Sequence, residues 1–287
     1  VCNSFYATAG AIVACGAKPV FVDCDDRYQI NVEKIKQKIS RKTKAILPVH
    51  WGGASPNMYK ILKLAKQYKL KVIEDACMGI GGKIYGKSPG TFGDINAFSM
   101  HPLKSLNVMG DGGMIVTNNK KLFEWLSKFR NHGMINRDNI EFWGVNARLQ
   151  PLQAVVAMNG LKKINSVIKK RNSNAKLMDK LLKNLYPNII MPNRPQSFRE
   201  TFSLYMLLAN KRDKLMNFLL RKNIETKIHY PIPLNKQRAS KYLNLNQKDF
   251  KIANLQAKKL ITLPIHQFLT KNQIIYIAQS IKEFYKK

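Results

Sequence analysis

Short apolar runs alternate with amphipathic segments through the first 130 residues of the chain. Five runs of mainly apolar residues have the length of buried strands, and they lie at residues 19–23, 43–50, 70–75, 95–100 and 114–117. Apolar residues recur at helical spacing in the segments at residues 5–15, 32–39, 58–68 and 122–130. Asn31 can cap the second of these helices, in which Val32, Ile35 and Ile39 share one face. Strands and helices that alternate at such short intervals predict parallel crossovers, and hence an α/β fold with a mostly parallel central sheet and flanking helices.

The pattern changes near residues 164–174. Helices are predicted at residues 151–163, 170–185, 213–221 and 271–285, and strands at residues 202–209 and 226–229. The helix at residues 151–163 precedes the change, and the other elements form a smaller α+β unit. We therefore expect a large domain at residues 1–165 and a small C-terminal domain at residues 166–287.

Lys104 lies between the apolar strand of residues 95–100 and a turn that contains Gly110, Gly112 and Gly113. A lysine held between two core strands is partly desolvated, which lowers its pKa and leaves more neutral amine to attack a carbonyl carbon. This is the chemistry of a Schiff base. From this stretch alone, one surface lysine among many is an equally good interpretation.

A second stretch supplies carboxylates that favour a catalytic role for Lys104. Glu74 and Asp75 end the apolar strand of residues 70–75. Such carboxylates face the crevice in which ligands bind to open α/β sheets. Pyridoxal phosphate needs a lysine for its aldehyde and a carboxylate that keeps its ring nitrogen protonated. Lys104 and Asp75 can fill these two roles.

Several motifs follow one another in order along nearly the whole chain. They are Val72-Ile-Glu-Asp-Ala76, Gly93-Asp-Ile with Phe98-Ser-Met-His-Pro-Leu-Lys104, Gly110-Asp-Gly-Gly113, Arg130-Asn-His-Gly133, Gly144-Val-Asn-Ala-Arg-Leu149, Ile228-His-Tyr-Pro-Ile-Pro-Leu234 and Leu263-Pro-Ile-His266. This set closely resembles the DegT/DnrJ/EryC1/StrS family of pyridoxal-phosphate-dependent nucleotide-sugar aminotransferases. The resemblance implies a fold-type I aminotransferase architecture in which the large domain binds the cofactor.

The resemblance also implies roles for single residues of the cofactor site. Lys104 is expected to form the Schiff base and later to shuttle the proton. Asp75 is expected to pair with the ring nitrogen, Ser99 to donate a hydrogen bond to the phosphate, and Phe5 to stack on the ring. Met78 stands close to the cofactor hydroxyl, where family members usually carry Gln or His, and methionine cannot donate that hydrogen bond.

Other implied roles concern the substrate and a second subunit. Asn146 and Arg148 resemble the residues that reach the phosphate region of the neighbouring subunit's site, so a homodimer with shared active sites is implied. His229 and Tyr230 are expected to approach the sugar. A loop histidine and a packed aromatic residue are equally good interpretations of these two.

The chain begins at Val1, before a strand that is not the first of the large domain in this family. Family members usually carry about fifty further residues here, including a turn and helix N-terminus that grip the phosphate. We therefore expect that the N-terminal part of the large domain is missing and that the cofactor site of the chain as given is incomplete.

The formal charge of +32, from 49 basic and 17 acidic residues, raises the alternative of nucleic-acid or anionic-membrane binding. The lysines are spread over helix faces and no nucleic-acid module accompanies them, so we expect neither nucleic-acid nor membrane partners. The four cysteines, Cys2, Cys15, Cys24 and Cys77, include no CxxC pair and suit reduced thiols, and no metal site is expected. With no apolar run of membrane-spanning length and no signal peptide, the expected compartment is the cytosol.

The sequence therefore predicts transfer of an amino group, by resemblance from glutamate, to a keto group of a nucleotide-linked sugar. The expected product is an amino-deoxysugar for surface polysaccharide. Related dehydratases replace the lysine by histidine, so Lys104 argues against that reaction. A degenerate regulatory homologue remains the alternative, favoured by Met78 and by the short N-terminus.

Overall fold

The computed structural model describes residues 1–286 and contains a four-stranded central sheet. Its strands are β1 (Ala45–Ile46), β2 (Lys71–Asp75), β4 (Ile95–Ser99) and β5 (Gly113–Val116), in the order β1-β2-β4-β5. The first three strands run parallel, and β5 pairs antiparallel with β4. The predicted α/β fold with a mostly parallel sheet is therefore confirmed.

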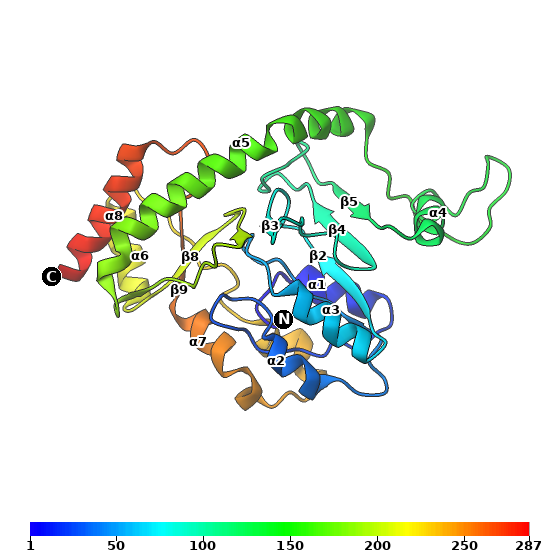
Figure 1. Ribbon diagram of the computed structural model, residues 1–287, viewed down its shortest axis with the longest axis horizontal. Helices are drawn as coiled ribbons and strands as arrows, with labels where there is room; N and C mark the ends of the chain where they lie inside the picture. The colour runs from blue at the N-terminus through cyan, green and yellow to red at the C-terminus, as the bar shows by residue number, and fades with distance from the viewer. Residues whose placement is uncertain (287) are drawn as a thin grey trace.

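Three N-terminal helices flank this sheet, and Figure 1 shows α1 and α3 beside β2. They are α1 (Tyr6–Ala14), α2 (Val32–Ile35), which continues as a 3-10 turn (Lys36–Lys38), and α3 (Met58–Gln67). The side chain of Asn31 accepts the backbone N–H groups of Glu33 and Lys34, as predicted for a helix cap. Apolar residues of α3 bury against β1 and β2, and this core includes Met58, Ile61, Ala65, Ile46 and Val72. The amphipathic pattern thus explains why these segments cover the sheet.

A second sheet lies towards the C-terminus and is antiparallel. Its strands are β6 (Ile189–Ile190), β8 (Tyr205–Ala209) and β9 (Leu260–Leu263), in the order β6-β8-β9. The helices of this half are α5 (Pro151–Leu182), α6 (Arg212–Arg221), α7 (Lys251–Lys259) and α8 (Lys271–Lys286), with 3-10 turns at Lys183–Leu185, Leu234–Lys236, Arg238–Leu243 and Gln247–Phe250. Residues of α5, α6, α8 and the sheet form one apolar core, which includes Met178, Leu207, Leu215, Ile261 and Ile277.

Two predicted strands are wrong in the structure, and two predicted helices are one. Residues 19–23 form no strand, because Val22 O accepts only the N–H of Cys2 and no neighbouring strand completes a ladder. Residues 226–229 contribute only an isolated bridge from Lys227 to Thr262. The helices predicted at residues 151–163 and 170–185 are one helix, α5, because the polar residues between them are compatible with helical structure.

One helix stands apart from both sheets. Figure 1 shows α4 (Lys120–Phe129) and the loop after it projecting at the end of the molecule opposite α8. Trp125 of α4 stacks on Phe129 and on Phe142 of that loop, with ring centroids 4.8 and 5.3 Å apart. The projection is therefore held together by its own aromatic residues. Within residues 1–286, no helix combines the length and apolar character that a bilayer crossing requires.

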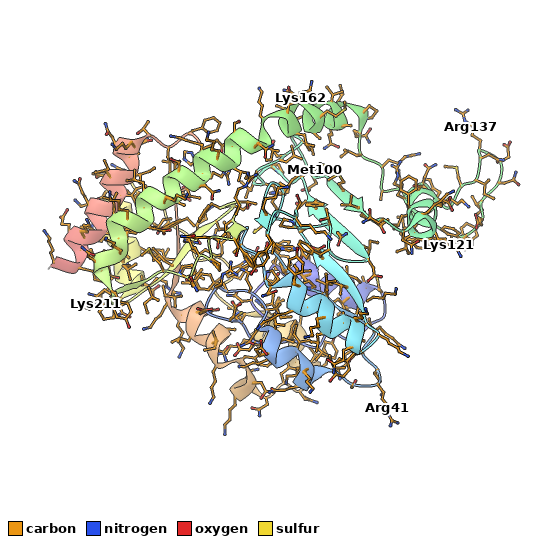
Figure 2. All side chains as sticks on the ribbon, in the orientation of Figure 1. Arg41, Met100, Lys121, Arg137, Lys162 and Lys211 are labelled. Atoms are coloured by element: carbon orange, nitrogen blue, oxygen red, sulfur yellow. The ribbon has the colours of Figure 1, made fainter. Side chains whose placement is uncertain are left out.

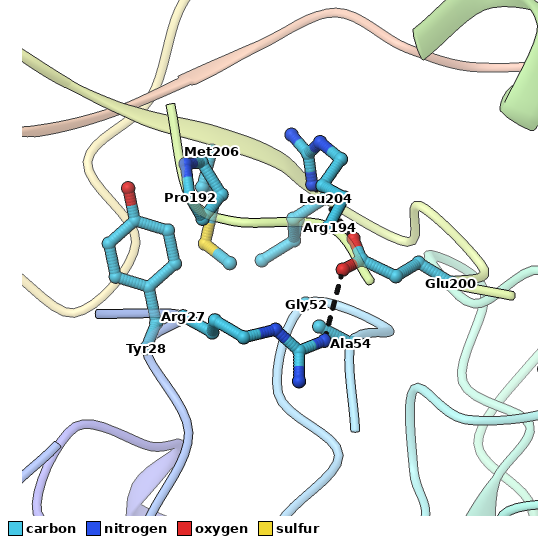
Figure 3. Close-up of a pocket in the computed structure, with 9 residues that line it drawn as sticks. All are labelled: Arg27, Tyr28, Gly52, Ala54, Pro192, Arg194, Glu200, Leu204 and Met206. Atoms are coloured by element: carbon cyan, nitrogen blue, oxygen red, sulfur yellow. Dashed lines mark hydrogen bonds and ion pairs between the residues drawn. The ribbon is translucent and has the colours of Figure 1, made fainter. Parts of the chain in front are cut away.

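An ionic cluster joins the N-terminal third to the segment after α5, as Figure 3 shows. The Glu200 carboxylate accepts hydrogen bonds from the guanidinium groups of Arg27 at 3.3 Å and Arg194 at 2.8 Å. Arg194 also donates to the Asp179 carboxylate at 3.0 Å. The cavity beside this cluster measures about 10 Å³, which is about the space of one water molecule. It is too small to be a substrate site. A short strand pair, β3 (Lys83–Ile84) with β7 (Phe198–Arg199), adds a second link.

Basic side chains lie on all sides of the molecule. Figure 2 labels Arg41, Lys121, Arg137, Lys162 and Lys211 at well-separated points of its outline. The positive charge is therefore spread over the surface, in agreement with the sequence pattern.

Candidate active site

Asp75 ends β2 and is held through both carboxylate oxygens. Its Oδ2 accepts the hydroxyl of Thr8 at 2.7 Å, and its Oδ1 accepts the backbone N–H of Cys77 at 3.2 Å. Thr8 lies on α1, one helical turn after Phe5, and its hydroxyl is 3.0 Å from that of Ser4. Helix α1 therefore fixes the orientation of the Asp75 carboxylate.

Lys104 lies in the turn after β4, and its amine shares a site with Asp75 and Cys77. Burial lowers the pKa of Lys104, and Cys77 and Asp75 partly oppose this effect. Burial also raises the pKa of Cys77 to about 12, with Asp75 adding to the rise and Lys104 opposing it. Because Lys104 and Cys77 interact with each other and with Asp75, the amine, thiol and carboxylate lie in the same space.

Glu74 is not part of this site, although the sequence analysis placed both carboxylates in the crevice. The Glu74 side chain is fully buried and accepts three backbone N–H groups of residues 90–93, at 2.6–2.8 Å. His50 Nε2 lies 2.7 Å from Glu74 Oε2. Successive residues of a strand point to opposite faces of the sheet, so only Asp75 of this pair reaches the crevice.

The Glu74 carboxylate remains ionised in this buried position. Burial alone would raise the pKa of Glu74, but the hydrogen bonds from His50 and from the backbone of Gly93 and Gly90 outweigh it and hold the pKa below its ordinary value. His50 Nδ1 lies 2.9 Å from Ser55 Oγ, so both ring nitrogens of this buried histidine are occupied. His50 is therefore a structural residue.

Aromatic side chains surround the same crevice. The ring centroid of Phe5 lies 4.0 Å from that of Tyr6 and 5.9 Å from that of Tyr230. Tyr230 in turn lies 5.8 Å from Trp51. Burial raises the pKa of Tyr230 to about 12, and the charge of Asp75 adds to this rise. The Tyr230 hydroxyl therefore stays protonated at neutral pH and lies near Asp75.

His229 lies near Lys104 and is uncharged at neutral pH. Its Nδ1 lies 2.9 Å from Thr262 Oγ1 on β9. Burial lowers the pKa of His229 to about 4, and the positive charges of Lys227 and Lys104 lower it further. The His229-Tyr230 pair thus brings the C-terminal half of the chain to the site.

Ser99 and Met78 lie on the elements that carry Lys104 and Asp75. Ser99 ends β4, and its Oγ accepts the N–H of His101 at 3.3 Å. Met78 Sδ accepts the N–H of Gly52 at 3.2 Å, and its side chain packs on the apolar cluster that contains Trp51. The expected contacts of Ser99 and Met78 with a cofactor stay predictions.

Asn146 and Arg148 lie on the segment between α4 and α5, away from the residues gathered around Asp75. Asn146 forms an isolated bridge with Asn131, and Arg148 Nη1 donates to Asn131 Oδ1 at 3.0 Å. Their hydrogen bonds stay within this segment in the described chain. The role expected for them in a second subunit stays a prediction.

Sequence analysis missed Thr8, Cys77 and Trp51. A signal existed for Thr8, because the threonine one turn after Phe5 shares its face of α1. Cys77 lies two residues after Asp75, but a lone cysteine in an apolar run is typical of a core residue. Trp51 follows a strand of only two residues, so its side chain could not be placed from the strand pattern.

The grouped residues fit pyridoxal phosphate. An amine of lowered pKa, a carboxylate and aromatic rings are the groups that its aldehyde, ring nitrogen and ring face require. The buried Ser105 Oγ, next to Lys104, has no hydrogen-bond partner among residues 1–286 and can accept or donate one to a ligand.

Comparison with known proteins agrees with this geometry. Residues 1–282 match the family model described as the DegT/DnrJ/EryC1/StrS aminotransferase family. The chain is 35% identical to a pleiotropic regulatory protein of Geobacillus stearothermophilus, over 99% of this chain and 77% of that protein. It is also 35% identical to UDP-N-acetyl-3-dehydro-alpha-D-glucosamine 3-aminotransferase of Acidithiobacillus ferrooxidans, over 97% of this chain and 75% of that one. The crystal structure of a DegT DnrJ EryC1 StrS aminotransferase from Brucella abortus matches with a TM-score of 0.92 at 30% identity, over 99% of this chain and 78% of that chain.

Proposed function

The chain belongs to the DegT/DnrJ/EryC1/StrS aminotransferase family, which uses pyridoxal phosphate, and we propose that it aminates the keto group of a nucleotide-linked sugar. The observation that carries this proposal is the interaction of the partly buried Lys104 amine, in the turn after β4, with Asp75, which ends the neighbouring parallel strand β2. The curated relatives with named substrates act on nucleotide-linked sugars. An amino-deoxysugar for surface polysaccharide is the product that fits this substrate class.

Lys104 carries the proton transfer in this mechanism. When bound, pyridoxal phosphate supplies the aldehyde that takes up the amino group and a ring that accepts the electron pair left by deprotonation. Burial increases the neutral fraction of the Lys104 amine, so Nζ can attack a carbonyl carbon and act as a base. Lys104 Nζ then moves a proton from the donor's α carbon to the carbon that carried the aldehyde.

Asp75 and the residues around it orient the ring. The Asp75 carboxylate holds the proton on the ring nitrogen, and Thr8 fixes the position of its Oδ2. Phe5 offers a ring face, with Tyr230 behind it. With the cofactor bound, Ser99 would donate a hydrogen bond to its phosphate and Met78 would lie near its hydroxyl group, while His229 and Tyr230 would contact the sugar. Because His229 is neutral and its Nδ1 is engaged with Thr262, its Nε2 is left to donate or accept one hydrogen bond with a sugar hydroxyl group.

The proposed amino donor is glutamate, and the proposed compartment is the cytosol. The test uses purified protein with pyridoxal phosphate in two half-reactions, each followed by absorbance. Glutamate alone is expected to convert the cofactor to its amino form and to release 2-oxoglutarate. A 3-keto or 4-keto sugar linked to UDP, dTDP or GDP is expected to reverse the change. If glutamate converts the cofactor but none of these sugars reverses the change, the proposed acceptor is wrong.

Lys104 and Asp75 also bear on the alternative of a degenerate regulatory homologue. Both residues are present and lie together, as catalysis requires. Met78, which favours the alternative, packs on the apolar cluster that contains Trp51 and leaves both residues in place.

We further propose a homodimer that covers the projecting segment and completes the site. Several large apolar side chains between residues 103 and 161 are exposed, among them Trp143 (88%), Leu152 (82%) and Leu103 (81%). Leu103 directly precedes Lys104, so this apolar surface reaches the site. On α5, the exposed residues Leu152, Val155, Met158 and Leu161 recur every three positions and form one stripe. So much exposed apolar area is typical of a subunit interface.

Sedimentation of the holoenzyme tests the dimer. Trp143→Glu is expected to weaken dimerisation about a hundredfold, because a buried aromatic residue at an interface centre contributes about 2–4 kcal/mol. Phe268→Glu is the matched control, since Phe268 is equally apolar and exposed (79%) but lies in the C-terminal half. A wild-type protein that sediments as a monomer at micromolar concentration would contradict the proposal.

A further inference from the structure

A groove of about 580 Å³ lies between α6 and the end of α8. Figure 1 shows these helices at the end of the molecule opposite α4, and Figure 2 labels Lys211 at the same end. The groove is formed only by residues of the C-terminal half, and it shares no residue with the crevice around Lys104. Its volume is within the range of small-molecule sites, about 300–1,000 Å³.

Helix α6 and the residue before it supply three cations to the groove. Lys214, Phe218 and Arg221 follow one another at spacings of four and three residues, which places them on one side of the helix, and Lys211 is its N-cap residue. The buried Leu215 and Leu219 lie on the neighbouring side of the helix, which faces the apolar core of this half. None of the three cations forms an ion pair or hydrogen bond through its side chain within residues 1–286.

The neighbouring carboxylates are occupied by other cations. Asp213 binds Arg212 at 2.9 Å, and Glu283 binds Lys222 at 2.6 Å. Neither carboxylate lines the groove. The groove therefore keeps the charge of its three cations, which favours an anionic ligand.

Aromatic rings form the other part of the groove. The ring centroids of Phe218 and Phe284 lie 5.6 Å apart, and those of Phe284 and Tyr285 lie 4.9 Å apart. The Tyr285 hydroxyl donates to Asn210 O at 2.5 Å, and burial raises the pKa of Tyr285 to about 12. The tyrosine is thus uncharged at neutral pH and adds only apolar surface to the groove.

We propose that this groove binds a nucleoside diphosphate or triphosphate, at a second site distinct from the catalytic crevice. The phosphates bind Lys211, Lys214 and Arg221, and the base packs on Phe218 and Phe284. Phosphate groups bind to cations and a nucleotide base stacks on aromatic rings, and this groove offers both. The ligand is either a free nucleotide or the nucleotide part of a nucleotide-linked sugar, and both share this chemistry. The proposal does not depend on the transferase activity.

Photolabelling of the holoenzyme with 8-azido-ADP, followed by peptide mapping, locates the site. Label is expected on the peptides of α6 or the end of α8. Binding of a fluorescent ADP analogue is then measured in Lys211→Glu/Lys214→Glu. The double variant is expected to lose the label on α6. Its affinity for the fluorescent ADP analogue at this groove is expected to fall about tenfold or more, because two charge-assisted contacts are lost.

The matched control is Lys63→Glu/Lys66→Glu, which makes the same charge change at the same spacing on α3. It is expected to keep the label. Phe218→Leu is expected to weaken the nucleotide about tenfold while leaving inorganic pyrophosphate unchanged, which also shows that the groove is still folded. UDP and UDP-N-acetylglucosamine, used as competitors, distinguish the two sources of the nucleotide. Label that is confined to other peptides, or equal binding by the two double variants, would overturn the proposal. The transferase rate of the same variants tests the proposed function separately.

Discussion

Replacing Lys104 by alanine is expected to lower the rate of amino transfer about 10⁴-fold or more, because one amine supplies both the covalent link and the proton transfer. The same change is expected to remove the covalent attachment of the cofactor. Borohydride reduction of the wild-type holoenzyme, followed by mass spectrometry, is expected to show one cofactor mass on the peptide that contains Lys104. The variant is expected to show none.

Lys83→Ala is a matched control for this change. Lys83 is also a partly buried lysine, but its amine donates to Ser88 on the β3 hairpin, away from the crevice. Its variant is expected to keep both the label and the rate. A reduced cofactor on any other lysine of the wild-type protein would contradict the role assigned to Lys104.

The sequence predicted the candidate site best at positions where the function requires particular residue types in a fixed order. Lys104 and Asp75 were identified from their strand ends and motifs, and the structure brings them together. Phe5, His229 and Tyr230 were predicted from the resemblance, and they lie around the same crevice. Their roles in binding stay predictions.

Sequence periodicity predicted less accurately those elements whose contacts are made with residues distant in the chain. Residues 19–23 have the composition of a strand, but a strand needs a neighbour to pair with, and the backbone oxygens of this segment accept single hydrogen bonds from residues 2 and 31. Residues 169–174 are all polar and interrupt the apolar pattern, yet α5 continues through them because its two ends pack against different cores. The division into domains at residues 165 and 166 therefore lies inside a helix and stays a proposal.

The clearest missed contacts are side-chain hydrogen bonds. The bond from Thr8 to Asp75 spans 67 residues and depends on how α1 sits on the sheet, which no local pattern contains. Likewise, the strand pattern shows that Glu74 and Asp75 point in opposite directions, but it does not show which of them faces the crevice. The packing of α1 near Asp75 and of residues 90–93 near Glu74 decides this.

Replacing Glu74 by alanine is expected to lower the free energy of unfolding by about 4 kcal/mol or more. Three backbone N–H groups of residues 90–93 and the His50 ring would lose their acceptor inside the protein, and each unsatisfied buried group costs about 1–3 kcal/mol. Gly90 has a φ of +78° and depends on this bond to keep its turn in place. Chemical denaturation followed by circular dichroism measures the change.

The exposed Glu33, which pairs with Lys60 on the surface, provides the control, and Glu33→Ala is expected to change the free energy of unfolding by about 0.5 kcal/mol or less. In the folded protein the pKa of Glu74 is held below its unfolded value. The ionised Glu74 carboxylate therefore contributes fully to the free energy of unfolding above about pH 4.3, and this contribution is lost as the pH falls through the folded pKa. The stability difference between wild type and Glu74→Gln is therefore expected to shrink below about pH 4. Equal destabilisation by Glu74→Ala and Glu33→Ala would show that the buried carboxylate does not hold the loop of residues 90–93 in place.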